Sequence, residues 1–130
     1  MPHENPLAQL RQAAEAVRQQ LQVNNFDEAA VRRLETFIEE QRPLLTKETT
    51  QGVVVALGAF FGECLVQQFK GEWASAPDGT TGVGVRGDLF FNPFFRVAMQ
   101  LEKGLDESVV GFFESMPARL AEPPKKKGWI

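Results

Sequence analysis

The stretch VVVALGAFFGECLV, residues 53–66, constrains the fold more than any other part of this chain. It carries one charged residue, Glu63, and is otherwise apolar or small nearly all round. A helix with such a surface must be surrounded by other elements. The stretch is also shorter than the roughly 20 apolar residues that cross a bilayer. We therefore predict a buried central helix, from about Thr46 to Phe69, that the rest of the chain covers.

Two helices are predicted before this central helix. Apolar residues of the first recur at steps of three and four, which places them on one helical face. These residues are Leu7, Leu10, Ala14, Val17 and Leu21. Asn5, followed by a proline, is a typical helix start. Asn25, with Glu28 three residues later, resembles a capping box for a second helix over residues 26–41, which stops before Pro43.

The hydrophobic period changes to that of strands after residue 71. Three short runs, residues 72–75, 82–85 and 89–91, are separated by the turn sequences Pro77-Asp78-Gly79 and Arg86-Gly87-Asp88. This pattern predicts a three-stranded antiparallel meander. Such a sheet needs a cover on its apolar face, and the central helix is the candidate.

Two further helices are predicted at the C-terminal end. Asn92-Pro93 begins the first, and Asp106 is expected to cap the second, which ends near Pro117. The expected inner residues of the first are Phe94, Val97, Ala98, Leu101 and Leu105; those of the second are Val109, Phe112, Phe113 and Met116. The sequence thus predicts one α+β domain over residues 1–121, followed by a flexible basic tail over 122–130.

Composition excludes several classes of function. A net charge of −3 disfavours a nucleic-acid partner, because phosphate contacts need a basic face. The single cysteine, Cys64, excludes a disulfide framework and a multi-cysteine zinc site. The single histidine, His3, lies near the N-terminus, which excludes most histidine-based catalysis and metal chemistry. We expect no cofactor, no metal and no membrane partner. No signal-peptide pattern opens the chain, so a cytoplasmic location is expected.

Glu63 is the most unusual residue, because an unpaired carboxylate in an apolar helix is costly. Its partner is predicted to be the indole N–H of Trp73 or the guanidinium of Arg86 or Arg96. The alternative is a general acid or base in a pocket that these four residues line. Cys64, next to it in the same apolar company, is expected to be an inert buried thiol.

The corner around Asn92 is the second place where a function is expected. Four phenylalanines surround it, and their spacing cannot send all four inward, since Phe90 and Phe91 alternate on a strand. Phe90, Asn92 and Phe95 are therefore a candidate interface, with packing in the core as the competing interpretation. Glu35, Glu39 and Glu40 of the second helix are interpreted as a solvated face.

The order of motifs resembles a group of small bacterial proteins of unknown function. The motifs are an LGxxxGE helix (Leu57 to Glu63), a GxW strand (Gly71 to Trp73) and a helix led by Asn92-Pro93-Phe94. The resemblance spans about residues 52–116. It implies a bacterial source and an α+β fold but no reaction. Some members look like accessory proteins of toxin or secretion loci, which favours protein binding.

These observations predict a non-enzymatic bacterial domain that binds another protein, as an immunity-type or regulatory partner. A homodimer through the aromatic corner is compatible with this prediction. The alternative is a small-molecule-binding protein or minor enzyme with a pocket between the central helix and the sheet.

Overall fold

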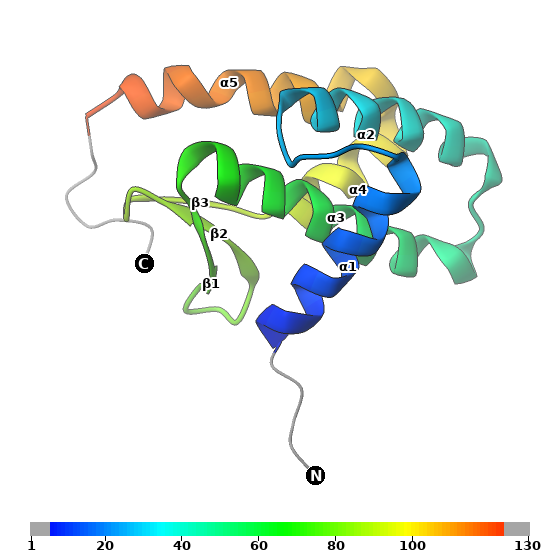
Figure 1. The fold of residues 1–130 in the computed structure, drawn as a ribbon, viewed down its shortest axis with the longest axis horizontal. Helices are drawn as coiled ribbons and strands as arrows, with labels where there is room; N and C mark the ends of the chain where they lie inside the picture. Colours follow the sequence, from blue (N-terminus) through cyan, green and yellow to red (C-terminus); the bar gives the residue numbers. More distant parts are fainter. Residues whose placement is uncertain (1–5, 124–130) are drawn as a thin grey trace, which may run out of the picture.

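The computed structural model describes residues 6–123 as five α-helices and one antiparallel sheet (Figure 1). In chain order the elements are α1 (Pro6–Leu21), α2 (Glu28–Gln41), α3 (Lys47–Phe69), β1 (Glu72–Ser75), β2 (Thr81–Val85), β3 (Leu89–Phe91), α4 (Pro93–Lys103) and α5 (Val109–Ala121). Short 3-10 turns, Arg42–Leu44 and Gly104–Glu107, follow α2 and α4. The predicted α+β arrangement is confirmed. The predictions for His3, Asn5 and residues 124–130 of the tail lie outside the described residues.

The helix α3 is the centre of the fold. Figure 1 shows it surrounded by α1, α2, α4, α5 and the sheet, and its residues from Leu57 to Leu65 are all buried. Thr46 caps its start in a reciprocal pair with Thr49, as a capping box does. The whole helix has 23 residues, so by length and composition alone it could cross a membrane. Half of its most apolar 18-residue window is buried inside the fold, and the core helix of a soluble protein meets the same length and composition criterion.

The sheet presents one face to α3. Its strands lie in the order β1-β2-β3, with Trp73 opposite Val83 and Val83 opposite Phe91. Partners directly opposite each other share a face, and Val83 and Phe91 belong to the core. Gly84 and its partner Phe90 take the other face by alternation. The ring of Phe90 covers the neighbouring Gly82, where a Cβ atom would lie 2.7 Å from it.

Two glycines of α3 let other parts of the chain approach its backbone. A Cβ atom on Gly58 would lie 2.9 Å from the Cα atom of Phe94, and one on Gly62 would lie 2.2 Å from the indole of Trp73. Both distances are far below van der Waals contact. The predicted close packing at Gly58 and Gly62 is therefore confirmed: the start of α4 covers the first glycine, and β1 supplies the ring that covers the second.

The start of α2 differs from the prediction. Asp27, not Asn25, caps the helix, and its side chain accepts a hydrogen bond of 3.0 Å from the backbone N–H of Ala30. Asn25 is exposed. Phe26 packs on Phe60 of α3 with ring centroids 5.3 Å apart, and this contact places the next residue at the cap.

The start of α5 differs as well. Ser108 caps it by accepting hydrogen bonds from the backbone N–H groups of Val110 and Gly111, whereas Asp106 lies in the preceding 3-10 turn. Gly104, with φ of 79°, turns the chain out of α4, so the predicted inner residue Leu105 is 60% exposed. The helix continues through the exposed Pro117 and ends at Ala121.

A polar junction joins α2, α4 and α5, and it corrects the prediction of a solvated acidic face. Gln100 is fully buried; its Nε2 donates to Glu39 (2.9 Å), and its Oε1 accepts from the backbone N–H of Val109 (2.9 Å). Glu35 accepts a hydrogen bond from the Ser108 hydroxyl. Glu35 and Glu39 thus hold helices together, while Glu40 is exposed as predicted.

Candidate functional site

Glu63 is buried at 7% exposure, and neutral donors hold its carboxylate. Its Oε2 accepts a hydrogen bond of 3.0 Å from the indole N–H of Trp73, and its Oε1 accepts a longer one of 3.4 Å from Gln67. The indole also lies against Gly62 and 6.0 Å from the ring of Phe94. The indole was one of the three partners predicted for this carboxylate. The ring packs against α3 beside this carboxylate.

Arg86 does not join Glu63. It lies in the β2–β3 turn, where its backbone has the left-handed conformation (φ of 64°). Its Nε and Nη2 donate hydrogen bonds of 2.7 and 2.8 Å to the carboxylate of Asp88. Its Nη1 donates to the backbone oxygens of Leu120 and Glu122 at the end of α5. Free carbonyls at a helix C-terminus are satisfied by such a cation. Arg86 therefore ties the sheet to α5.

Arg96 does not join Glu63 either. Its guanidinium lies over the ring of Phe112, with Cζ 4.2 Å from the centroid, and 5.9 Å from the ring of Phe95. Partial burial lowers the pKa of Arg96, and the positive charge of Arg119 lowers it further, while Glu107 acts in the opposite direction. The four residues of the predicted pocket are thus split: Glu63 and Trp73 are joined, and the two arginines have other partners.

Arg119 approaches the same ring from α5. Its Cζ lies 5.0 Å from the centroid of Phe112 and 5.8 Å from that of Phe91, and its Nε donates to the Ser115 hydroxyl at 2.9 Å. Two guanidinium groups from different helices therefore share one aromatic ring. Cation–π contacts of this kind stabilise by about 0.5–1 kcal/mol each at exposed sites.

A recess of about 200 Å³ lies beside these arginines, between α4, the 3-10 turn and α5. Arg96, Arg119, Leu105, Phe112 and Glu107 are among the residues that line it. We call the surface formed by Phe95, Arg96, Leu105, Phe112 and Arg119 the arginine–phenylalanine face. Within residues 6–123, neither arginine of this face forms an ion pair with a carboxylate.

The three residues of the predicted interface have separate positions. Asn92 caps α4, and its Oδ1 accepts a hydrogen bond of 3.0 Å from the backbone N–H of Phe95. Phe90 lies on the outer face of the sheet over Gly82. Phe95 is 52% exposed and belongs to the arginine–phenylalanine face. Asn92 therefore has a structural role, and only Phe95 joins this face.

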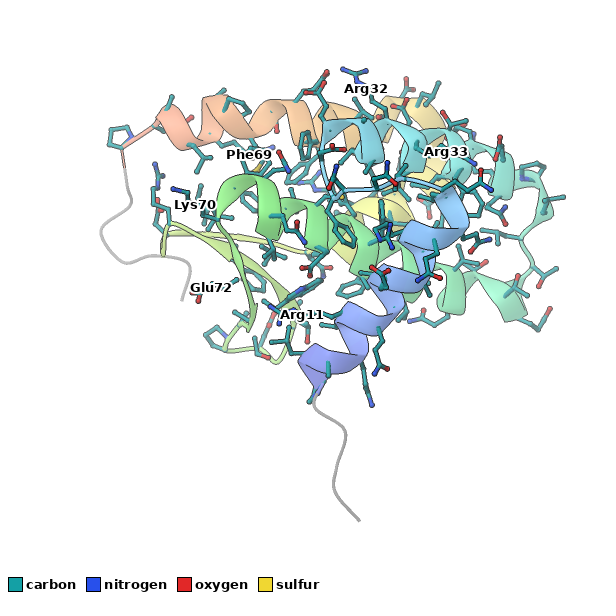
Figure 2. The ribbon with its side chains drawn as sticks, viewed as in Figure 1. Arg11, Arg32, Arg33, Phe69, Lys70 and Glu72 are labelled. Carbon is teal, nitrogen blue, oxygen red and sulfur yellow. The ribbon has the colours of Figure 1, made fainter. Side chains whose placement is uncertain are left out.

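Larger hollows lie elsewhere on the described part of the molecule, among them one of about 280 Å³ beside Arg86 and Glu72. An apolar groove of about 350 Å³ runs between α1, α3 and the start of α4, with Leu10, Val55 and Phe94 in its lining. Another hollow of about 430 Å³ has Phe69 and Phe113 in its walls. At its side Arg32 bridges Glu28 of α2 (2.8 Å) and Glu114 of α5 (2.7 Å), at the junction visible in Figure 2.

The residues with reactive or metal-binding side chains do not form a further site within the described part of the chain. No group of three or more His, Cys, Asp or Glu side chains among residues 6–123 could hold a metal ion. Cys64 is fully buried, and burial strongly raises the pKa of its thiol, with Asp27 and Glu63 adding to the effect. A protonated, buried thiol is a poor nucleophile, as the sequence predicted.

No family model, no curated protein and no solved structure matches this chain. The motif resemblance to small bacterial proteins therefore stays a prediction, and the geometry alone supports a functional proposal.

Arg119, Phe112 and Leu105, three members of the arginine–phenylalanine face, were not predicted from the sequence as site residues. Arg96 and Arg119 belong to different helices and meet only on the ring of Phe112. Helical spacing relates residues three or four positions apart, so it holds no signal for such a pair.

Proposed function

We propose that this protein is a protein-binding domain of the bacterial cytoplasm, of the immunity or regulatory kind, and that its partner docks on the arginine–phenylalanine face. The observation that carries the proposal is the exposure of Phe95 (52%) and Leu105 (60%) beside Arg96 and Arg119. Arginine and aromatic residues are enriched at the energetic centres of protein interfaces.

The face has the build of an interface rather than of chance exposure. Single exposed apolar residues are common and need no explanation. Here two of the four large apolar side chains that are exposed in residues 6–123 are neighbours of one arginine pair. Asn92 caps α4, which carries Phe95 and Arg96, and Ser108 caps α5, which carries Phe112 and Arg119. Most residues of the face therefore lie on helices with well-defined starts, while Leu105 lies in the 3-10 turn between them. A preformed surface loses less conformational entropy on binding.

The proposal is tested by capture from a bacterial lysate on the immobilised protein. We expect the wild type to capture a stoichiometric partner. The double variant Phe95→Ala/Leu105→Ser should bind this partner with an affinity at least about tenfold lower, which corresponds to about 1.4 kcal/mol of binding free energy. Val55→Ser is the matched control, because Val55 is also exposed (43%) but lies in the apolar groove. Equal capture by the double variant and the wild type contradicts the proposal.

A second copy of the chain is one partner that this test distinguishes. Sedimentation at several concentrations shows a dimer if two copies meet through the arginine–phenylalanine face, and the double variant then stays monomeric. A wild-type monomer at all concentrations, with the partner captured, shows a heterologous complex.

The apolar groove favours a second candidate function, the binding of a small apolar ligand. Its volume of about 350 Å³ falls in the range of ligand sites, and Val54, Val55 and Phe94 supply apolar walls. A thermal-shift screen against a metabolite set tests it: a shift that Val55→Ser abolishes supports this function, and no shift rejects it.

A further inference from the structure

We propose that the recess between α4 and α5 receives a single carboxylate, from an Asp or Glu side chain of the protein partner. This inference rests on the proposed function and names the group that the arginine–phenylalanine face recognises. Four observations carry it: the free donors of the arginines, the partial burial of Arg96, the charges around them and the size of the recess.

The donors come first. A guanidinium has five N–H donors and no acceptor, and its planar fork fits a carboxylate. Arg96 donates no hydrogen bond to any residue in 6–123, and Arg119 donates one, to Ser115. Both guanidinium groups lie over the ring of Phe112. The pair therefore offers oriented and unused donors beside an aromatic wall.

The burial of Arg96 adds a cost that a ligand would remove. The residue is half-buried and lies close to a second cation, and both conditions disfavour its charged form. An anion between the two guanidinium groups would offset this repulsion and form charge-assisted hydrogen bonds, which are the strong class. In the free protein the ring of Phe112 is the only group that the structure shows stacked on both cations within residues 6–123.

The other charges at the recess select the kind of anion. Asp106 and Glu107 also line it, so two carboxylates stand against two guanidinium groups. A phosphate, a sulfate or a nucleic acid would carry its extra charge toward these carboxylates and be repelled. One carboxylate carries less charge toward Asp106 and Glu107, so it is repelled less while it faces the arginines. The recess of about 200 Å³ suits a small side-chain group.

The start of α5 contributes no free donors to this site. The backbone N–H groups of Val110 and Gly111 already bond to the Ser108 hydroxyl. Recognition therefore depends on the two arginine side chains, which makes them the residues to change.

The test uses the full chain with its arginine side chains labelled with ¹⁵N. The Nε–Hε signals are followed by NMR while N-acetyl-glutamic acid α-amide, which carries one carboxylate, is added at constant ionic strength. We expect saturable shifts of Arg96 and Arg119 with a Kd on the order of 10 mM, as a few charge-assisted hydrogen bonds give. The neutral analogue N-acetyl-glutamine amide should cause no shift. Sodium sulfate should bind more weakly than the carboxylate, despite its higher charge.

The chain supplies matched controls. Arg33 of α2 also stacks on a phenylalanine, with Cζ 6.0 Å from the ring of Phe37, but it does not line the recess; Figure 2 shows it on α2 and the exposed Arg11 on α1. Their signals should not saturate. Arg96→Gln and Arg119→Gln should each weaken the probe by at least about tenfold, and Arg33→Gln should leave it unchanged. Circular dichroism checks that each variant is folded. If Arg96→Gln is not folded, Arg96→Lys replaces it in the test, because lysine keeps the positive charge over Phe112.

Three results would overturn the inference. One is an absence of saturation at Arg96 and Arg119, another is an equal response of Arg33, and the third is tighter binding of sulfate than of the carboxylate. Failure of the site and failure of the proposed function remain distinguishable. If the partner is captured in a Phe95-dependent way but the probe does not bind, the carboxylate site is wrong and the interface stands. If the probe binds but the double variant captures the partner as well as the wild type does, the proposed function is wrong. The assignment of the carboxylate to a protein partner is then wrong too.

Discussion

The close approach at Gly58 gives the sharpest prediction about stability. Gly58→Ala adds a methyl group that would lie 2.3 Å from the Cδ1 atom and 2.9 Å from the backbone Cα atom of Phe94. The ring can rotate, but the backbone belongs to the first turn of α4, which its Asn92 cap holds in place. The whole of α4 must therefore shift to accept the methyl group. Gly52→Ala is the matched change in the same helix, because a Cβ atom there meets nothing within 4 Å.

The two substitutions share one contribution to the free energy of unfolding, the gain in helix propensity, and differ in another, the cost of overpacking. Each replaces a helical glycine by alanine, which stabilises a helix by about 1 kcal/mol. Overpacking a filled core costs about 1–3 kcal/mol. Contacts as short as those at Gly58 belong at the upper end of that range, so we expect Gly58→Ala to destabilise by about 2 kcal/mol. Gly52→Ala should stabilise by up to about 1 kcal/mol, and the difference of about 3 kcal/mol isolates the packing against α4.

Urea unfolding, followed by circular dichroism, measures both values. For a chain of 130 residues the loss in Gly58→Ala corresponds to a Tm lower by roughly 6–10 °C. The slope of the free energy against urea should not change, since the surface exposed on unfolding stays the same. A Gly58→Ala variant as stable as the wild type would refute the reasoning, because it would show that α4 yields at no cost.

Three further predictions concern buried polar groups. Glu63→Leu should destabilise by about 2 kcal/mol, since it leaves the indole N–H of Trp73 without an acceptor, whereas Glu63→Gln keeps an acceptor; equal urea midpoints for the two variants would contradict this. Gln100→Leu should cost about 2–3 kcal/mol, because it orphans the backbone N–H of Val109, and a midpoint like that of the wild type would show that water replaces the amide. Cys64 should react with iodoacetamide at least roughly 100-fold faster in urea than in the native state, and equal rates would place the thiol at the surface. The raised pKa of this thiol also makes stability depend on pH. Above about pH 8.5 the Cys64 thiol ionises in the unfolded chain but not in the folded one, so the free energy of unfolding should fall there. Cys64→Ala should remove that decline.

The arrangement of helices and strands could be predicted from the sequence where local pattern decides it. The all-apolar surface of α3 requires a central position, and the turn sequences around β2 set the meander. The positions of Gly58 and Gly62 predicted a close approach, although not the residues that make it. In these cases the information lies within a few residues, which is the range of helix and strand periodicity.

The helix starts show where local pattern is insufficient. Asn25 and Asp27 have the same capping chemistry, and so do Asp106 and Ser108. The packing of Phe26 on Phe60, from another helix, selects one of two cap residues that lie two positions apart. The sequence cannot rank such neighbours without the tertiary contact.

The arginine–phenylalanine face was the least predictable part. Phe95 and Arg96 were both candidates, but they were assigned to separate sites, an interface and a pocket. Their union depends on Phe112, which periodicity assigns to the core and which is indeed only 6% exposed. The stacking of Arg96 and Arg119 on that ring is a contact among α4 and α5 that no spacing in the chain encodes.

The contacts of α2 have a consequence for how the chain folds during synthesis. Arg32 bonds to Glu114, 82 residues later, and the backbone oxygen of Glu35 accepts from Gln100, 65 residues later. Contacts so distant in sequence form slowly and only when both segments exist. The helix α2 therefore leaves the ribosome well before α4 and α5 do. We expect a nascent chain that ends before Val109 to be digested readily by protease, and one that carries α5 clear of the ribosome through a linker to resist.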